Sequence, residues 1–355
     1  MAVLVARPAA VRPDGGDRRR GLLCRAGSRA GGLVLLLVLL LGVCLLSLRV
    51  GSVELSAQTV WRAFTDFDGS NEHLIVTSLR LPRTLIGLGV GAALAVAGAV
   101  MQAVTRNPLA GPDILGVNAG AAFAIVTAVF LLGVVSPSMY VWFAFAGAAV
   151  TTVLVYGIGS VGRTGPSPVK LALAGVVVTS LLGSWTSGVL VFNERTLDEV
   201  RFWLAGSLAG RDLGVFWQVS PFLVGGTVVG LLLTRQLNAL ALGEDVSRSL
   251  GQRTALVRAG CAVLVVLLAG GAVAAAGPIG FVGLAVPHVA RALVGPDHRW
   301  LVPYAAVLGP VLLIAADVVG RVVARPAELQ AGIVTAIVGA PFRIHLARRR
   351  KLAGL

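Results

Sequence analysis

The two lysines of this chain are the first place to look for nucleotide chemistry. Lys170 and Lys351 are the only lysines among 355 residues, and neither follows a glycine. The GxxxxGK[ST] loop, in which backbone amides and a lysine hold the phosphates of a nucleotide, is therefore absent. We predict that the chain does not hydrolyse ATP.

Side chains that could perform catalysis or bind a metal ion are isolated from one another. An enzyme inside a bilayer needs a nucleophile beside its base, or a cluster of metal ligands. The four histidines lie in different loops or helix ends: His73, His288, His298 and His345. The three cysteines form no CxxC pair and have no histidine at ligand spacing: Cys24, Cys44 and Cys261. The sequence predicts no catalytic site, no cofactor, no metal site and no disulfide framework.

Ionisable residues are almost absent from the apolar segments. Transporters driven by a proton or sodium gradient usually carry such groups at mid-membrane depth. Here Asp317 and Arg321 lie at the outer edge of one apolar segment, and His288 lies near the inner end of another. This pattern disfavours an ion-gradient-driven secondary transporter, which is kept as an alternative. A permease powered by a separate ATPase fits the pattern better.

The composition requires that a bilayer be part of the solvent of the chain. Hydrophobic residues make up 56% of the sequence and charged residues 13%, against about 45–50% and about 25% in globular proteins. The net charge of +14 could suggest nucleic-acid binding, but the basic residues lie between long apolar runs and are not interleaved with aromatic residues. We predict an all-α integral membrane protein that does not bind nucleic acid.

Ten apolar runs are candidates for transmembrane helices, which need about 20 mostly apolar residues. They cover residues 31–48, 85–104, 114–132, 139–157, 169–192, 213–234, 256–276, 280–292, 301–316 and 331–346. Glycine and proline interrupt the run at 280–292, and such a span is tolerated only when it is packed inside protein. The first run resembles a signal peptide, but nine further spans favour a retained helix. We predict one permease domain over residues 29–355.

The distribution of arginine and lysine predicts the orientation. If both termini are cytoplasmic, that side holds 21 of the 30 basic residues: seven in the N-terminal tail, nine in four loops and five from Arg343 to Lys351. Such an excess marks the cytoplasmic side of the cytoplasmic (inner) membrane. Residues 1–28 are expected to form a disordered basic tail, which acts as a topology signal or also contacts anionic lipid headgroups.

A cytoplasmic surface for the ATPase is expected between the sixth and seventh spans, at 235–258. Two glycines bracket a short segment that begins with Glu244 and Asp245, where a helix dipole favours acidic residues. Val246 and Leu250 then share one helix face. The segment is therefore predicted to be a short amphipathic helix that fits a groove on another protein, or alternatively a loop lying on the membrane surface.

The chain resembles the FecCD family of ABC-importer permeases, which includes vitamin B12, haem and ferric-siderophore permeases. The resemblance runs from about residue 76 to 350. It rests on five segments: SLRLPRTLIGLGVGAALAVAGAVMQAVTRNPLAGPDILGVNAGAA, FWLAGSLAGRDL, LNALALGEDVSRSLG, AGPIGFVGLAVPHVARALVGPDHRWLVPY, and ADVVGRVVARPAEL followed by GIVTAIVGAPF. It implies the ABC type II importer permease fold with ten helices, without ATPase activity of its own.

The resemblance also implies partners. Such a permease works as a pair, with an identical or homologous second permease subunit, two ABC ATPase subunits on the cytoplasmic side and an extracytoplasmic binding protein. The expected cargo is an iron(III)-siderophore complex, with cobalamin or haem as alternatives. Membrane lipid surrounds the assembly.

The resemblance further implies roles for individual residues. The arginines expected to contact acidic residues of the binding protein are Arg80, Arg83 and Arg321, although Arg80 and Arg83 could instead simply snorkel to the interface. The cytoplasmic coupling loop, at about 236–254, carries the expected ATPase contacts: Leu242, Gly243, Glu244, Asp245, Arg248 and Leu250. The inner end of the translocation path is expected at Met101, Gln102, Asn107 and Pro108.

Overall fold

The computed structural model describes residues 22–23, 25–134, 136–161, 168–211, 213–325 and 327–352, and every regular element in these ranges is helical. The predicted tail at 1–28 falls mostly outside the described residues, and α1 already begins at Ala26. The elements are α1 (Ala26–Arg49), α2 (Ala57–Thr65), α3 (Asn71–Leu74), η1 (Ile75–Arg80), α4 (Leu81–Thr105), η2 (Pro112–Leu115), α5 (Val117–Leu132), α6 (Pro137–Ser160), α7 (Pro168–Phe192), α8 (Glu194–Leu204), α9 (Leu213–Leu232), α10 (Thr234–Ala241), α11 (Glu244–Ser249), α12 (Thr254–Val265), η3 (Val266–Gly270), α13 (Gly271–Ala276), α14 (Val282–Val294), α15 (His298–Val323) and α16 (Ala331–Leu352).

The predicted ten-span architecture is confirmed. Within the described residues, seven helical runs are long and apolar enough to cross a bilayer, and three shorter apolar helices, α5, α14 and the apolar part of α16, supply the rest. The second span differs from its prediction, because a continuous helical run extends over Asn71–Thr105 and not only over 85–104. Charged residues mask its beginning in a search for uncharged runs, although the helix itself continues through them.

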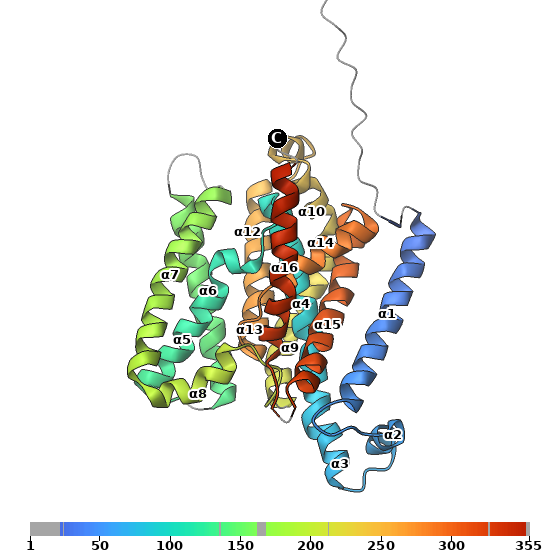
Figure 1. The fold of residues 1–355 in the computed structure, drawn as a ribbon. Coiled ribbons are helices and arrows are strands. Elements are labelled where there is room, and N and C mark those ends of the chain that lie inside the picture. The colour runs from blue at the N-terminus through green and yellow to red at the C-terminus, as the bar shows by residue number, and fades with distance from the viewer. Residues whose placement is uncertain are drawn as a thin grey trace, which may run out of the picture.

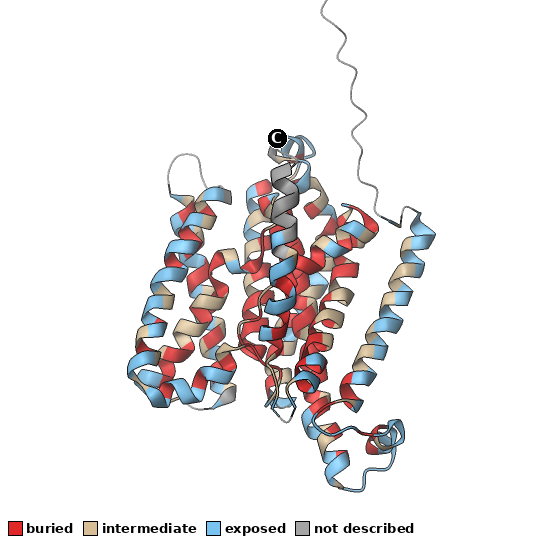
Figure 2. Cartoon of the chain, in the orientation of Figure 1, coloured by how far each residue is buried: buried red, intermediate tan, exposed pale blue. Residues whose placement is uncertain are grey.

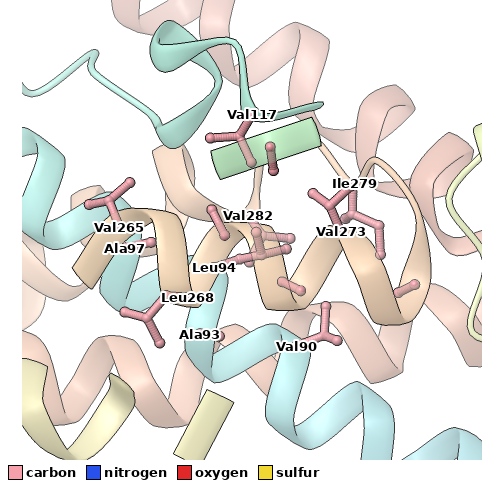
Figure 3. Close-up of a cluster of buried hydrophobic side chains, with 14 of the residues drawn as sticks. Val90, Ala93, Leu94, Ala97, Val117, Val265, Leu268, Val273, Ile279 and Val282 are labelled. Atoms are coloured by element: carbon pink, nitrogen blue, oxygen red, sulfur yellow. The ribbon is translucent and has the colours of Figure 1, made fainter. Parts of the chain in front are cut away.

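Helix α4 is the centre of the bundle, packed by α15, α14, α9 and α13 (Figure 1). Eighteen of its 25 residues are buried, whereas α1 stands at the edge of the bundle and is largely exposed (Figure 2). Valine, alanine and leucine side chains of α4, α13 and α14 interdigitate at the centre (Figure 3). Helices α5, α6 and α7 form a group on the side away from α1.

Small residues in α4 let its backbone approach those of its neighbours closely. A Cβ atom on Gly98 would overlap the carbonyl oxygen of Gly283 in α14, and one on Gly91 would lie 2.6 Å from Pro310 in α15. In a bilayer, helices associate through close packing of this kind and not through exclusion of water. Without side chains at these two positions, α4 touches both neighbours through backbone atoms.

The two ends of the bundle differ in what they carry. The end with the C-terminus also carries α10 and the beginning of α1, and it is called the α10 end here; the opposite end carries α8, α2 and α3 and is called the α8 end (Figure 1). At the α10 end, the amides of Leu22 and Leu23 donate to the carbonyl oxygens of Ala292 and Leu293, at the end of α14. The chain thus enters and leaves the bundle on the same side, as an even number of spans requires.

The short eighth span is packed inside protein, as predicted. Helix α14 contains Pro287, and the residues around it, from Val282 to Pro287, are all buried. Proline removes a helical hydrogen bond, which is tolerated at membrane depth only where protein surrounds the helix.

The contact of α4 with α14 gives a first prediction. We expect Gly98→Ala to lower the free energy of unfolding by about 1–3 kcal/mol, because the added methyl group forces two backbones apart. Thermal unfolding of the purified protein in detergent measures the loss. The control is Gly225→Ala in α9, where a Cβ atom meets nothing within 4 Å; equal unfolding temperatures for the two variants would contradict the proposed role of the contact.

Candidate functional site

Arg83 is the centre of an ion-pair cluster at the α8 end. Its guanidinium donates to both carboxylate oxygens of Asp317 over 2.8–3.0 Å and to Glu328 over 2.8 Å. The side chain of Asp317 is only 1% exposed, against 11% for that of Arg83. Two carboxylates on one guanidinium are strong, charge-assisted contacts, and they tie α4 to α15 and to the segment before α16.

Arg321 lies one helical turn beyond Asp317 and is fully buried. It pairs with Asp317 at 3.2 Å and donates to the carbonyl oxygens of Ser47 and Val50, each over 2.9 Å. A further hydrogen bond of 2.8 Å reaches the hydroxyl oxygen of Ser47. The last carbonyl groups of a helix lack intrahelical partners and carry the negative end of its dipole. Arg321 thus caps the C-terminal end of α1.

Arg80, at the end of η1, also caps the C-terminal end of α1. Its guanidinium donates to the carbonyl oxygens of Leu48 and Arg49 over 2.8 Å, and also to that of Val53. The residue is 5% exposed. Two arginines, from distant parts of the sequence, therefore bind the same helix end.

The structure brings the three predicted docking arginines together at the α8 end, but each of them is engaged inside the protein. Arg80 and Arg321 do not present their guanidinium groups to the surface, and Arg83 is almost covered. Their part in binding another protein stays a prediction. Sequence reasoning missed the partners Asp317 and Glu328, although an acidic residue at the edge of an apolar span is itself a signal for a charged partner.

The predicted coupling segment forms two short helices at the α10 end. α10 is followed by Gly243, whose φ of 110° is open to glycine alone, and then by α11 over the six residues Glu244–Ser249. This confirms the predicted short helix. Gly251, with φ of 78°, ends it.

The side chains of this segment fall into a buried anchor and an exposed apolar face. Ser247 is fully buried, and its hydroxyl oxygen lies 2.6 Å from the carbonyl oxygens of both Ala239 and Gly243, so that its single proton is donated to one or the other and holds α11 against α10. Leu242, Val246 and Leu250 are spaced by four residues and are 45–65% exposed. Asp245 and Arg248 are exposed as well, and the side chain of Glu244 lies outside what the structure describes. Ser247 was not among the predicted residues.

A polar network fixes α10 to the beginning of α15. Asn238 donates to Asp297 over 2.6 Å, and its amide oxygen accepts from the backbone amide of His298 over 2.9 Å. Burial raises the pKa of Asp297, but hydrogen bonds from Asn238 and from the amide of Arg299 outweigh it and hold this pKa below its usual value. Asp297 is therefore a carboxylate at neutral pH and caps α15.

The residues predicted for the translocation path are packed in this conformation. Met101 and Gln102 are buried, and Gln102 donates to the carbonyl oxygen of Leu284 and accepts from Arg291, both in α14. Asn107 and Pro108 are half-buried, and the side chain of Asn107 accepts from the amide of Leu109. Their role in a path stays a prediction. Among the described residues, no group of three or more side chains could hold a metal ion.

The ion-pair cluster gives a second prediction. We expect Asp317→Asn to lower the free energy of unfolding by about 3–5 kcal/mol, because Arg83 and Arg321 are left buried with their main counter-charge removed. The control is Asp198→Asn, which removes the exposed pair of Asp198 with Arg201 and should cost less than about 1 kcal/mol. Unfolding of both purified variants measures the difference; a loss for Asp317→Asn as small as for the control contradicts the central role of this carboxylate.

Known proteins match nearly the whole length of this chain. The model of the FecCD transport family matches residues 37–349. The "Probable siderophore transport system permease protein YfiZ" of Bacillus subtilis (strain 168) is 46% identical over 329 residues, which cover 92% of this chain and 99% of YfiZ. The ferric enterobactin transport system permease protein FepD of Escherichia coli (strain K12) is 46% identical over 320 residues, covering 90% of this chain and 95% of FepD.

A solved structure agrees with the fold. It is described as a metal-chelate type ABC transporter in an inward-facing conformation, and it superposes with a TM-score of 0.78 at 30% identity, covering 90% of this chain and 99% of its own. The family match over residues 37–349 agrees with the membrane spans and with the buried α4. The chain therefore belongs to the FecCD transport family, whose members are permease subunits of ABC importers and are not themselves enzymes.

Proposed function

We propose that the chain translocates iron(III)-siderophore complexes across the cytoplasmic membrane as the permease subunit of an ATP-binding-cassette importer. The observation that carries the cargo class is the agreement among relatives: YfiZ and FepD, both 46% identical over at least 90% of this chain, are named for siderophore and ferric-enterobactin transport. The related cobalamin and hemin permeases are 41% and 34% identical. Cobalamin and haem are therefore the alternative cargoes.

The α10 end is proposed to face the cytoplasm and to receive the ATPase. The excess of basic residues predicts this orientation. The exposed side chains of Val246 in α11 and of Leu250 at its C-cap supply an apolar face on a helix that Ser247 anchors to the bundle, and the exposed side chain of Leu242 precedes that helix. An apolar face on a short, firmly held helix fits a hydrophobic groove of a partner. Motion of that partner would then shift α10 and, through the hydrogen bonds of Asn238 to Asp297 and His298, the beginning of α15.

The α8 end is proposed to receive an extracytoplasmic binding protein. Arg83 and the exposed pair of Arg325 with Glu54 lie at this end and offer both signs of charge. Arg80 and Arg321 contribute by holding the surface in shape, since their donors are used inside the protein. Two such permease subunits, identical or homologous, would enclose the path, and two ATPase subunits would complete the importer. Both chain termini then lie in the cytoplasm.

Uptake measurements test the cargo. Cells that lack this chain are expected to lose uptake of ⁵⁵Fe-labelled ferric siderophore, with uptake of labelled cobalamin and haem unchanged, and to regain it with the wild-type chain. Depletion of ATP should abolish the restored uptake, whereas collapse of the proton gradient at constant ATP should not. Loss of cobalamin or haem uptake alone would show that cobalamin or haem is the cargo instead. Uptake that depends on the ion gradient and not on ATP would show that the chain is a secondary transporter.

The coupling face gives a further prediction. We expect Val246→Asp to weaken the association with the ATPase subunit about tenfold or more, because a charge replaces an apolar contact worth about 1.5–3 kcal/mol. The unfolding temperature of the permease should not change, since Val246 is exposed. Co-purification of the ATPase measures the association. The control is Val53→Asp, an equally exposed valine at the α8 end; the same loss of ATPase in both variants contradicts the assigned face.

A further inference from the structure

An excess of arginine lies at the α10 end, where α1 and α15 begin. The segments 22–32 and 291–304 together contain one acidic residue, Asp297, and have a net charge of +3. Their basic residues are Arg25, Arg29, Arg291 and Arg299. Both α1 and α15 are apolar spans that begin in these segments, so the positive charge lies at the level where a bilayer meets water. Most of it needs a counter-charge that these two segments do not contain.

The two segments are held side by side by contacts within the protein. The hydroxyl of Tyr304 in α15 donates to the carbonyl oxygen of Arg29 over 2.5 Å. The Nε atom of Arg29 donates to the carbonyl oxygen of Leu23 over 3.0 Å. A Cβ atom on Gly32 would lie 2.4 Å from the hydroxyl oxygen of Tyr304, so a side chain there would prevent this approach. The beginning of α1 and the guanidinium of Arg29 therefore have a fixed place beside α15.

The one carboxylate of the two segments is already engaged. Asp297 accepts from Asn238 over 2.6 Å and from the amide of Arg299 over 3.0 Å. Burial raises the pKa of Asp297, whereas these hydrogen bonds, and after them the positive charges of Arg299 and Arg29, lower it. Both guanidinium groups thus lie near this carboxylate. Among the described residues, however, no carboxylate lies within ion-pair distance of Arg25, Arg29 or Arg299.

The arginines are accessible from outside the protein. Arg25 and Arg299 are exposed, and Arg29 is half-buried. The half-buried Trp300 follows Arg299 directly, and tryptophan is enriched where a bilayer meets water. Because α1 stands at the edge of the bundle and is largely exposed (Figure 2), a lipid molecule can reach the corner between α1 and α15.

Apolar surface continues from this corner along α1. Leu33 and Leu36 pack against the bundle on the side of α1 that also carries Arg29. Leu37 and Leu39 flank this side and are each 48% exposed. A molecule with a negative headgroup and apolar chains fits such a surface, because the headgroup meets the arginines while the chains cover the leucines.

We propose that the corner between the beginnings of α1 and α15 binds an anionic phospholipid, with Arg25, Arg29 and Arg299 around its phosphate group. Guanidinium groups form strong, charge-assisted hydrogen bonds with phosphate, and basic pockets between transmembrane helices bind anionic headgroups. The lipid joins α1 to α15 at the α10 end, as Arg321 does at the α8 end. With the proposed orientation, it belongs to the cytoplasmic leaflet.

Native mass spectrometry of the purified permease–ATPase complex tests the site. The probes are phosphatidylglycerol and phosphatidylcholine with the same acyl chains. We expect tighter binding of phosphatidylglycerol, weakened about fivefold by Arg25→Gln or Arg299→Gln and about 25-fold by both together, with binding of phosphatidylcholine unchanged. The control replaces two exposed arginines at the α8 end, Arg49→Gln with Arg62→Gln, and should bind both lipids as the wild type does.

Unfolding temperatures separate a lipid contact from a structural role. In phosphatidylcholine alone, the double variant of Arg25 and Arg299 should unfold at the wild-type temperature, because both residues are exposed. Added phosphatidylglycerol should raise this temperature in the wild type and in the control, but much less in the double variant. A lowered temperature of the double variant in phosphatidylcholine alone overturns the proposal, as it would show that the arginines bind other parts of the protein.

Soluble competitors distinguish a lipid from a free phosphate. Glycerol 3-phosphate and inorganic phosphate should not displace phosphatidylglycerol at equal concentration, because they lack the chains that contact α1. Displacement by either of them overturns the assignment to a lipid.

Two further outcomes contradict the site. One is an equal affinity for phosphatidylglycerol in the wild type, the double variant and the control. The other is loss of the ATPase from the double variant with its lipid affinity unchanged, since the partner would then be an acidic surface of the ATPase. The uptake assay tests the cargo separately: absence of all ferric-siderophore uptake defeats the proposed function and leaves a measured lipid preference intact.

Discussion

The approach of α4 to its neighbours is the constraint from which the remaining architecture follows. Inside a bilayer the hydrophobic effect does not push helices together, so association depends on how closely their surfaces fit. Gly91 and Gly98 bring the backbone of α4 against α15 and α14, and the surrounding valine and alanine side chains fill the remaining space. Once α4, α14 and α15 are fixed in this way, the ends of α4 and α15 coincide, and charged residues at those ends can meet.

The ion-pair cluster depends on that coincidence and extends it to the edge of the bundle. Asp317 balances Arg83 and Arg321, and the remaining donors of Arg321 and Arg80 hold the end of α1. α1 has few buried residues of its own, so these hydrogen bonds supply much of what joins it to the protein at this end. These charged residues at the end of the bundle thus first of all hold α1, α4 and α15 together. Any contact with a binding protein is made by a surface that they keep in place.

Much of the fold could be read from the sequence, because length and hydrophobicity determine which segments cross a bilayer. The ten spans were predicted on these grounds. The short helix that begins at Glu244 was predicted from its bracketing glycines and its acidic first turn, and the packing of the eighth span from its glycine and proline residues. What failed was local and had a physical cause. The helix of the second span runs from Asn71 through Arg80 and Arg83 because Arg83 is paired with acidic residues more than 200 residues away and Arg80 is hydrogen-bonded to carbonyl groups of α1, and no local pattern reveals such partners. The burial of Gln102 and the anchoring by Ser247 likewise depend on tertiary contacts that periodicity does not encode.

α15 reaches from one end of the bundle to the other. Its 26 residues span about 39 Å; its first residue, His298, is bonded to Asn238 of α10, and Asp317 lies near its last turn. Pro303 and Pro310 lie inside the helix between these two points, and each removes a helical hydrogen bond. Both ends of α15 nevertheless carry polar contacts that fix neighbouring segments: α10 at its beginning, and Arg83 and the end of α1 near its last turn.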